Sequence, residues 1–472
     1  MSSSSSKTLV KAEKSVVDFC SKDLLDYATY DTYRKLQSAI DGLKTSQRKL
    51  LYTMRKKHPT EFIKTENFAN ETANETQYLH GAANLTGVAS LMAQSFVGSN
   101  SYPYFLGNSG GFGCRLNPIF SAPRYTRVTM NPKTAGLWSA EDDPVLEKQF
   151  FEGSWIEPKY FVPVLPALFL NMGEGLSTGF AETVYPRNPK ELIKYIKTCL
   201  KELEDEPGTK TFSKAHKMKL APWFRNHKGE VRWNKEKEQW ENTGRVEVRS
   251  STLLEVVELP IGMQYFKYVE TLDKLCDDGL IVNYEDKCDT KNDSISFFVK
   301  VNRVFLDGNR EQDALVDALK LVKGLPENFC FIDDTNRVRE FKDVYEILDM
   351  YVSIRIKTYE ARKENSLQEL KSKIVKNYSK YLFCRGIVDE TIVVAKKSKA
   401  DIEAQLDKID KIVRIDGSYG YLLSMPIHSI SKETMDELKK IVTDLKDQYA
   451  ELKGKTVAQM WEEDIAAIEK NF

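Results

Sequence analysis

The pair Arg124-Tyr125 follows a glycine-rich stretch, Gly107 to Gly113, and has the residue types for nucleophilic chemistry. A tyrosine oxygen attacks well only after it loses its proton, and its unperturbed pKa is near ~10. A neighbouring cation such as Arg124 would stabilise the phenolate. The pair alone does not establish this role. The chain has 22 tyrosines, and a packed tyrosine beside a surface arginine is the commoner arrangement.

Positive charge gathers in the first third of the chain, although the whole chain is neutral, with 69 basic and 69 acidic residues. Residues 1–135 carry 17 Lys and Arg against 10 Asp and Glu. From Arg34 to Lys57, eight basic residues accompany one acid, Asp41. A positive surface on a neutral protein suits a localised polyanion site. A solvated basic face explains the charge equally well.

Cysteine and histidine usage argues against a metal centre and against a disulfide framework. The seven cysteines form no CxxC pair, and the five histidines do not cluster with them. Scattered cysteines are typical of a reducing cytosol, so we expect a cytoplasmic protein with no metal ligands in this chain. The longest apolar stretch, Tyr160 to Met172, contains Pro163 and Pro166 and is too short to span a membrane.

Helices and strands must position these residues. The distribution of apolar and β-branched residues along the chain predicts an α+β fold of three domains after a disordered tail at residues 1–17. Within residues 18–157, a turn at Asp41-Gly42 precedes a basic helix, Ser46 to Lys57. A further helix from His80 to Phe96 leads into the glycine-rich loop. Short helices with a basic second member, followed by a loop and strands, predict a winged helix-turn-helix domain.

Residues 158–345 are predicted to form a separate domain of strands and helices. A helix is expected from Pro189 to Leu203, and β-branched or alternating patterns predict strands at four places. The four predicted strands are Phe161–Leu165, Arg245–Arg249, Ile295–Val301 and Arg303–Leu306.

Residues 346–472 have the apolar periodicity of long helices. Apolar residues recur at three- and four-residue steps from Leu367 to Tyr381 and again from Met435 to Leu452. Two such helices predict an antiparallel coiled coil, with a globular tip in the segment between them. A plain helical bundle fits the same periodicity.

Seven short segments follow one another in a recognisable order. They are Ile40 to Lys49, Leu79-His80-Gly81, Ala93 to Asn100, Gly111 to Arg115, Ala122 to Tyr125, Gly173 to Gly179 and Tyr421 to Met425. In this order and at these spacings they resemble the DNA-cleavage (breakage-reunion) subunit of type IIA DNA topoisomerases, with eukaryotic-like features in Ala93 to Asn100. The chain departs from the family pattern at Thr45, where proline is usual, at Leu79, which replaces a histidine, and at Cys114, which replaces a hydroxyl residue.

The resemblance implies a catalytic set. Tyr125 would become joined to DNA through a 5'-phosphotyrosyl link, which conserves the energy of the broken phosphodiester bond. Arg124 would stabilise the phenolate and the phosphate oxygens, and Arg34 would do so across a dimer. His80 would bind a phosphate or relay a proton, although a lone histidine more often has a structural role.

The resemblance also implies a DNA-binding set. Lys44, Arg48 and Lys49 would line the DNA backbone and contribute salt-sensitive attraction. Leu176 would act as an apolar wedge that partly unstacks a base step and kinks the duplex. Without the resemblance, Leu176 would be assigned to the hydrophobic core.

By the same resemblance, residues 158–345 would form a tower domain and residues 346–472 a coiled coil with a C-gate region that holds a homodimer together. The sequence contains no GxxxxGK[ST] loop, and Glu141-Asp142-Asp143 is an isolated acidic run. Mg²⁺ and ATP would therefore be bound by a partner subunit with ATPase and toprim regions. Met1 lies shortly before the first match, so either these regions belong to another polypeptide or the chain is an excised fragment. The Met-Ser start favours a split subunit of phage or viral medium type in the host cytoplasm.

The expected function is transient double-strand cleavage and religation of DNA. With its partner subunit, the enzyme would use ATP to pass one duplex through another and so relax and decatenate DNA. Negative supercoiling is not expected, because no wrapping domain follows the last helix. The alternative is a noncatalytic DNA-bending or scaffolding protein, which would use the same winged helix, Leu176 and the coiled coil.

Overall fold

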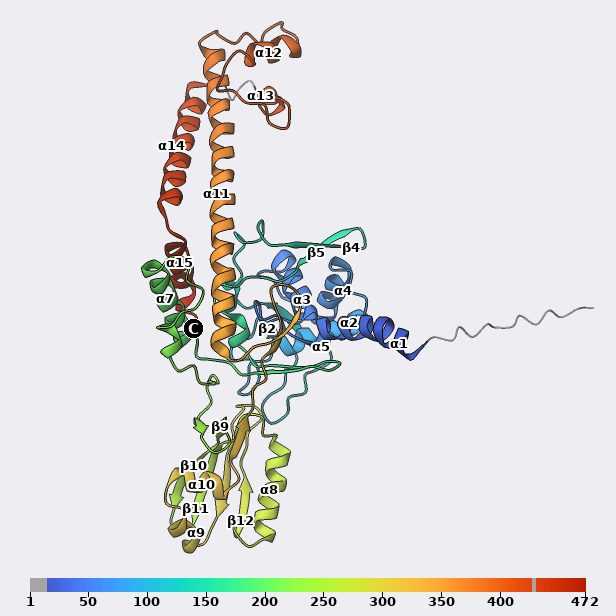
Figure 1. The fold of residues 1–472 in the computed structure, drawn as a ribbon, viewed down its shortest axis with the longest axis vertical. Coiled ribbons are helices and arrows are strands. Elements are labelled where there is room, and N and C mark those ends of the chain that lie inside the picture. Colours follow the sequence, from blue (N-terminus) through green and yellow to red (C-terminus); the bar gives the residue numbers. More distant parts are fainter. Residues whose placement is uncertain (1–14, 427–429) are drawn as a thin grey trace, which may run out of the picture. The chain divides into compact units, whose positions relative to one another are not determined.

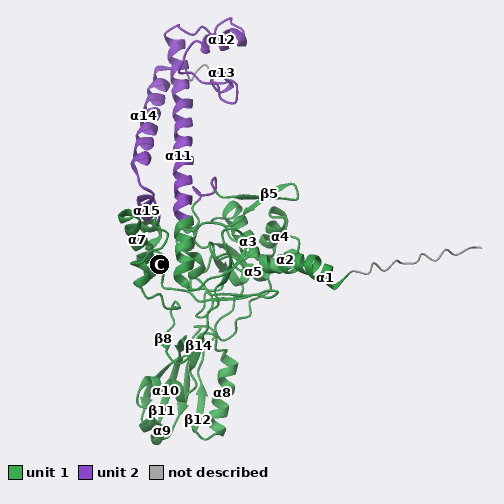
Figure 2. Cartoon of the chain, viewed as in Figure 1, with its two compact units in different colours: residues 1–139, 146–354, 465–472 green, residues 140–145, 355–464 purple. Residues whose placement is uncertain are grey.

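A computed structural model describes residues 15–426 and 430–472 and divides the chain into two compact units, which Figure 2 colours separately. The first unit takes in residues 1–139, 146–354 and 465–472, and the second takes in residues 140–145 and 355–464. The predicted tail at 1–17 lies outside the described residues as far as residue 14. Val16 and Val17 are already helical, so the folded chain begins earlier than predicted.

The first unit begins with a winged-helix domain, which confirms the predicted fold class (Figure 1). An N-terminal helical segment consists of α1 (Val16–Asp18), the π-helical turn η1 (Phe19–Leu24) and α2 (Leu25–Lys35). The domain itself consists of α3 (Thr45–Lys57), β1 (Ile63–Lys64), α4 (Thr65–Glu75), α5 (Ala82–Met92), β2 (Phe105–Asn108) and β3 (Arg127–Met130). The three strands form an antiparallel sheet in the order β1-β3-β2, and the segment between β2 and β3 is the wing.

The turn before α3 depends on a glycine. Gly42 has φ +64°, and a Cβ added there would come within 2.5 Å of the Leu168 backbone. Any other residue would therefore be strained and would collide with the segment behind it. The helix that follows buries Leu50, Leu51 and Met54 completely, which fixes the domain's core against α4 and α5.

The rest of the first unit is built from small antiparallel sheets and short helices. Its strands pair as β4-β5, β6-β7, β14-β9-β8, β10-β11-β13-β12 and β15-β16. The strands are β4 (Lys148–Phe151), β5 (Ser154–Pro158), β6 (Gly173–Leu176), β7 (Ala181–Val184), β8 (Val231–Asn234), β9 (Gln239–Thr243), β10 (Arg245–Ser250), β11 (Leu253–Glu258), β12 (Asn283–Asp286), β13 (Phe297–Lys300), β14 (Val322–Leu325), β15 (Cys330–Ile332) and β16 (Val338–Glu340). The helices are α6 (Pro132–Ala135), η2 (Ala167–Phe169), α7 (Pro189–Asp205), η3 (Ala215–Lys217), α8 (Tyr265–Asp277), α9 (Arg303–Gly308) and α10 (Gln312–Ala318).

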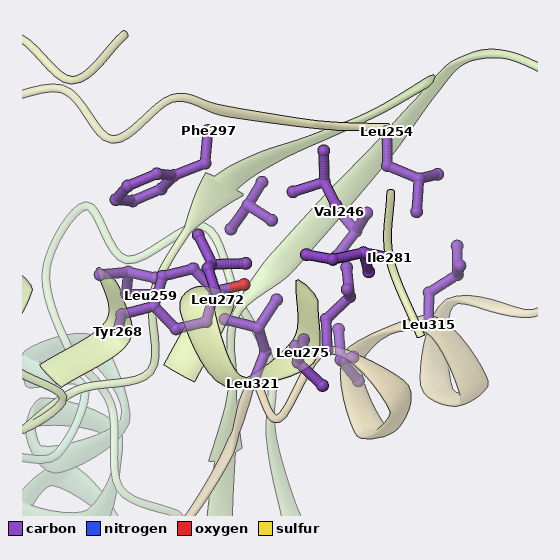
Figure 3. Close-up of a cluster of buried hydrophobic side chains, with 14 of the residues drawn as sticks. Val246, Leu254, Leu259, Tyr268, Leu272, Leu275, Ile281, Phe297, Leu315 and Leu321 are labelled. Carbon is purple, nitrogen blue, oxygen red and sulfur yellow. The ribbon is translucent and has the colours of Figure 1, made fainter. Parts of the chain in front are cut away.

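The four-stranded sheet carries one of the hydrophobic cores, which Figure 3 shows in close-up. Side chains of β11 and β13, such as Leu254 and Phe297, meet Tyr268 and Leu272 of α8, and all four are fully buried. Burial of each such side chain contributes roughly 1.5–3 kcal/mol. The cluster also takes in Leu315 of α10, so the strands and helices of this region form a single core.

Two of the four strands predicted for this region are wrong. Residues 161–165 are buried but irregular, because Pro163 and Pro166 lack the N–H groups that a ladder needs. The segment from Arg303 forms α9 instead of a strand, since the side chain of Asn302 accepts a hydrogen bond from Phe305 N and caps a helix. The strands predicted at Arg245 and Ile295 and the helix predicted at Pro189 are confirmed.

The second unit consists of long helices and a small globular tip. Its helices are residues 355–388 of α11 (Val344–Val388), α12 (Lys399–Leu406), α13 (Gly420–Leu423), α14 (Lys432–Gly454) and the first part of α15 (Val457–Glu469). Lys446 Nζ lies 5.7 Å from the ring centre of Tyr378, and Lys363 Nζ donates to Lys453 O at 3.2 Å, so α14 runs antiparallel to α11.

The tip of this unit has its own hydrophobic core. Buried residues of α12 and α13, among them Leu406 and Leu422, pack against Phe383 of α11. The globular tip predicted between the two long helices therefore forms. At the other end, Arg355 and Arg362 bind Asp142 and Asp464, which joins residues 140–145 to the helices.

Candidate active site

Tyr125 lies on the wing, immediately before β3. Its side chain is 67% exposed, and its N–H donates to Ala122 O at 2.9 Å to close a tight turn. Arg124 is exposed beside it, and none of the carboxylates in the described part of the chain forms an ion pair with it. An exposed phenol next to an unpaired guanidinium is available to an anionic ligand.

The wing is held at two places, one at the end that carries Tyr125 and the other within the loop. At the end that carries Tyr125, Thr126 is completely buried, its carbonyl accepts from Thr65 N at 3.0 Å, and its hydroxyl lies 2.7 Å from the Thr65 hydroxyl. Within the loop, the buried amide of Gln94 donates to Phe112 O at 2.8 Å and to Pro118 O at 2.9 Å. These contacts fix the backbone that carries Tyr125. No role was assigned to Thr65 or Thr126 from the sequence. The two residues are far apart in the chain, and only their β-branched side chains could have suggested that they pair across a sheet.

Arg34 and His80 lie together in a cavity of about 320 Å³ between α2, α3 and the segment that precedes α5. Tyr30 joins them: its hydroxyl is hydrogen-bonded to His80 Nε2, and the Arg34 guanidinium lies 5.7 Å from its ring centre. Desolvation and the positive charge of Arg34 hold the pKa of His80 below its usual value of 6.5. The imidazole is therefore neutral at pH 7 and is able to accept a proton.

The candidate catalytic residues fall into two groups within one chain. Arg34 and His80 line the cavity, together with Tyr33, Tyr78 and other residues of α2, α3 and β15, whereas Arg124 and Tyr125 do not line it. The wing thus presents an exposed tyrosine beside an arginine, and the separate cavity presents a neutral histidine beside another arginine.

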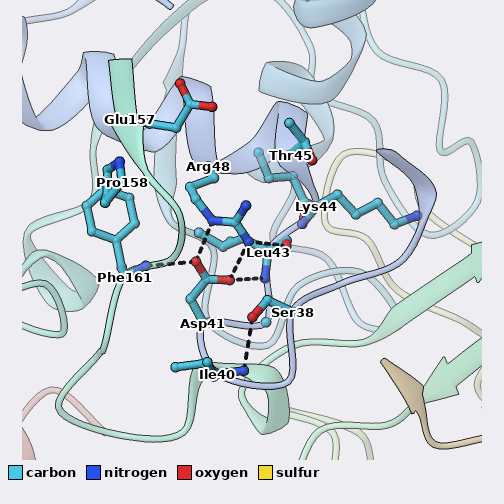
Figure 4. Close-up of polar contacts among 12 residues, drawn as sticks. Ser38, Ile40, Asp41, Leu43, Lys44, Thr45, Arg48, Glu157, Pro158 and Phe161 are labelled. Atoms are coloured by element: carbon cyan, nitrogen blue, oxygen red, sulfur yellow. Dashed lines mark hydrogen bonds and ion pairs between the residues drawn. The ribbon is translucent and has the colours of Figure 1, made fainter. Parts of the chain in front are cut away.

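Arg48 and Lys49, which are predicted to line the DNA backbone, are buried in this chain. Each is only 7% exposed, and each binds a buried carboxylate. Figure 4 shows Arg48 bound to both oxygens of Asp41, at 2.6 and 3.0 Å, while Asp41 also accepts from the N–H groups of Leu43 and Phe161. Lys49 Nζ lies 2.8 Å from Glu157 and donates to Thr76 O at 2.8 Å. Both positive charges are paired with buried carboxylates, which gives the two residues a structural role, and their contacts with DNA phosphates stay a prediction.

Leu176 lies at the tip of the β6-β7 hairpin, and its side chain is 75% exposed. The tip is held against α2, because Thr178 donates from both its N–H and its hydroxyl to Asp31, each at 3.0 Å. Lys44 Nζ donates to Glu174 O in the same hairpin at 2.5 Å. An apolar side chain that points into solvent from a fixed tip has no core role, so the residue types alone would have misassigned Leu176.

Strand β7 of this hairpin contains a titratable carboxyl that should make stability depend on pH. Burial raises the pKa of Glu182 from 4.5 to about 7, although Gln37 N–H and Lys44 act in the opposite direction. A raised folded-state pKa means that the stabilisation is complete below ~4.5 and is lost as the pH rises through about 7.

We therefore expect Glu182→Gln to flatten the pH dependence of unfolding between pH 5 and 8, by on the order of 3 kcal/mol. The measurement is denaturant unfolding at several pH values, with the exposed Glu236→Gln as a control. A Glu182→Gln profile parallel to that of the unmodified protein would show that Glu182 does not titrate in this range.

No group of three or more His, Cys, Asp or Glu side chains gathers to hold a metal ion anywhere in residues 15–426 and 430–472. Among the same residues, no helix has the length and apolar character needed to cross a membrane.

The wing of this winged helix carries an exposed Arg-Tyr pair, and the tip of the β6-β7 hairpin carries an exposed leucine. The family model for the A-type subunit of DNA gyrase/topoisomerase IV matches residues 34–466, and the chain belongs to this family.

Individual relatives agree with this assignment. The chain is 28% identical to the mitochondrial DNA topoisomerase 2 of Dictyostelium discoideum and 27% identical to the DNA topoisomerase 2 of Invertebrate iridescent virus 6, in each case over 96% of the chain. It covers 35% and 38% of those two proteins, so it spans about a third of the length of its curated relatives. A crystal structure of the Plasmodium falciparum topoisomerase II DNA-binding, cleavage and re-ligation domain superposes with a TM-score of 0.83 and 29% identity, covering 96% of this chain and 64% of that one.

Proposed function

We propose that this chain carries out DNA cleavage and religation in a type II DNA topoisomerase, with Tyr125 as the nucleophile. The observation that carries the proposal is the exposed Tyr125-Arg124 pair on a wing anchored at two places. A winged helix is a duplex-binding fold, and its wing is a suitable place for a side chain that must reach the backbone.

The proposed reaction is a transesterification. The Tyr125 oxygen attacks a backbone phosphorus and forms a Tyr–O–P bond, while the bond from phosphorus to the 3' oxygen breaks and that oxygen leaves with a proton. A 5'-phosphotyrosyl link results, and attack by the 3' hydroxyl reverses the reaction without a new energy source. Arg124 neutralises charge on the phenolate and on the phosphate oxygens.

The remaining catalytic residues act, in this proposal, from a second copy of the chain. Because Arg34 and His80 line a cavity that does not contain Tyr125, a homodimer would bring this cavity of one copy to the wing of the other. Neutral His80 would accept the phenol proton, and Arg34 would stabilise the phosphate. The two long antiparallel helices and their tip would hold the dimer at its C-gate.

Type II topoisomerases use Mg²⁺ and ATP. We assign both to a partner that carries the ATPase and toprim regions, and divalent cations would neutralise charge during phosphoryl transfer. With that partner the enzyme should relax and decatenate DNA. The test gives the reconstituted enzyme relaxed plasmid and ATP, and net accumulation of negative supercoils would contradict the proposal. We expect the enzyme to act in the cytoplasm of a host cell.

Leu176→Ala should reduce DNA bending and lower cleavage about tenfold while leaving the fold intact. The side chain is largely in solvent, so its removal leaves no cavity, whereas loss of the wedge removes the contact that offsets base unstacking. Bending is measured by energy transfer between the labelled ends of a duplex. Val304→Ala, at another exposed apolar residue, is the matched control, and equal bending by both variants would exclude Leu176 from the DNA site.

The exposed hairpin tip would also serve a noncatalytic DNA-bending or scaffolding protein, our second candidate. The two candidates differ at Tyr125, because only a cleavage enzyme forms a covalent adduct with DNA.

A further inference from the structure

A second, smaller cavity of about 220 Å³ follows α5 and is lined almost entirely by hydrogen-bonding groups. No carboxylate of the described residues lines it. The polar lining residues are Ser95, Ser99, Asn100, Ser101, Arg225 and Asn226. Hydroxyls, amides and a guanidinium without an acid are the groups that recognise an anion, and phosphate above all.

Arg225 supplies the positive charge of this cavity. It is half-buried, its guanidinium lies 5.3 Å from the ring centre of Tyr102, and it forms no ion pair with any carboxylate in the part of the chain that the structure describes. The Tyr102 ring is itself stacked on Trp223, at 6.4 Å and 21°, which holds the guanidinium against a firm surface. A partly desolvated arginine without an anion is unfavourable, so its charge is available to a ligand.

The serine hydroxyls beside Arg225 retain protons or lone pairs that could form hydrogen bonds with a ligand. Ser101 Oγ accepts from Arg225 N at 3.4 Å and keeps its own proton, and Ser95 makes no side-chain hydrogen bond within residues 15–426 and 430–472. Ser99 Oγ donates to Phe96 O at 2.6 Å. The loop is also closed on itself, because Asn100 Nδ2 donates to Gln94 O at 3.0 Å. The cavity is therefore preformed.

Gln94 connects the cavity to the wing. Gln94, whose carbonyl closes the cavity loop, is the residue whose side chain anchors the wing at Phe112 and Pro118. A ligand held at Arg225 would therefore be positioned relative to the segment that carries Tyr125.

We propose that this cavity binds one phosphate of the DNA backbone, with Arg225 and the Ser95 and Ser101 hydroxyls as donors, and so sets the register of the duplex against Tyr125. This inference rests on the proposed function. The cavity lies below the ~300 Å³ typical of sites for drug-sized molecules, which suits one phosphodiester group better than a whole nucleotide.

The test measures binding of a ~30-base-pair duplex to the full chain as a function of salt. Arg225→Gln should weaken binding about tenfold and reduce the slope of log affinity against log salt by about one, as expected for one lost phosphate contact. Arg225→Lys keeps the positive charge but loses the forked guanidinium. Its affinity for the duplex should lie between that of the unmodified protein and that of Arg225→Gln. Arg303→Gln, an equal charge change at an exposed position of α9, should match the unmodified protein. Equal affinity for the Arg225→Gln and Arg303→Gln variants would overturn the proposal.

Phosphate-ethylation interference separates a contact from a structural effect. Arg225→Gln should lose interference at one backbone phosphate of each half-site and keep the others, whereas uniform weakening at all phosphates would overturn the assignment. Inorganic phosphate and ATP, at matched ionic strength, are the free-anion probes. A contrary result would be that either anion stabilises the unmodified protein against heat but not Arg225→Gln, while both proteins bind duplex equally. That result would assign the cavity to a free anion and overturn the proposal. If the unmodified chain does not bind duplex at all, both this inference and the proposed function fail. If the unmodified chain binds duplex and the Arg225 variants bind it as tightly as Arg303→Gln does, only this inference fails.

Discussion

Tyr125→Phe should abolish covalent DNA adducts, a fall of at least about a thousandfold, while duplex binding is retained. The substitution removes one oxygen from a side chain that is 67% exposed, so neither the core nor the wing anchors at Thr126 and Gln94 are disturbed. The measurement is recovery of protein-linked DNA ends after denaturation of a reaction that contains the partner, ATP and Mg²⁺.

Tyr27→Phe is the matched control for this experiment, because Tyr27 is also exposed and lies on α2, outside the cavity and the wing. Mixed dimers extend the test. A Tyr125→Phe chain combined with an Arg34→Ala chain should cleave one strand if the site is shared between copies. Adducts formed by Tyr125→Phe homodimers would exclude this tyrosine as the nucleophile.

Asp41→Ala should destabilise the first unit by about 3–5 kcal/mol, the usual cost of removing one partner of a buried ion pair. Asp41 is completely buried and satisfies four N–H donors, two from Arg48 and one each from Leu43 and Phe161. Its loss leaves the Arg48 charge uncompensated and releases the loop that leads from α2 to α3. The free energy is measured by denaturant unfolding.

The control for Asp41 is an exposed pair. Asp307→Ala breaks the Arg310–Asp307 pair, whose side chains are both in solvent, and should change stability by less than about 1 kcal/mol. Adding Arg48→Met to Asp41→Ala should recover much of the loss, because the uncompensated charge is then gone. A cost near that of the Asp307 control would mean that Asp41 and Arg48 are not a structural pair.

Local sequence patterns determined the elements that depend on short-range physics. The apolar steps from Leu367 to Tyr381 and from Met435 to Leu452 predicted α11 and α14, because a helix buries one stripe at its own period. The β-branched run at Arg245 likewise predicted β10. Local competition explains the failures: Pro163 and Pro166 lack ladder donors, and the Asn302 cap favoured a helix over the β-propensity of the residues after Arg303.

Charge type alone did not reveal how the basic residues are used. Arg48, Lys49 and Arg225 are all cations in the sequence, yet the first two bind buried carboxylates and the third binds none among the described residues. The difference depends on Asp41 and Glu157, and Glu157 lies 108 residues from Lys49. An ion pair between residues so far apart in the chain leaves no local pattern.

The sequence by itself therefore determined the family, the long helices and the identity of the Arg124-Tyr125 pair, because motifs and periodicity are properties of neighbouring residues. Only the tertiary structure decided that Tyr125 and Leu176 are exposed and that Arg34 and His80 share a cavity without Tyr125. It also decided that Arg225 lines a second cavity together with three serines. Exposure and pairing depend on which distant segments pack together. That packing follows from burial of apolar surface over the whole chain, and burial is non-directional.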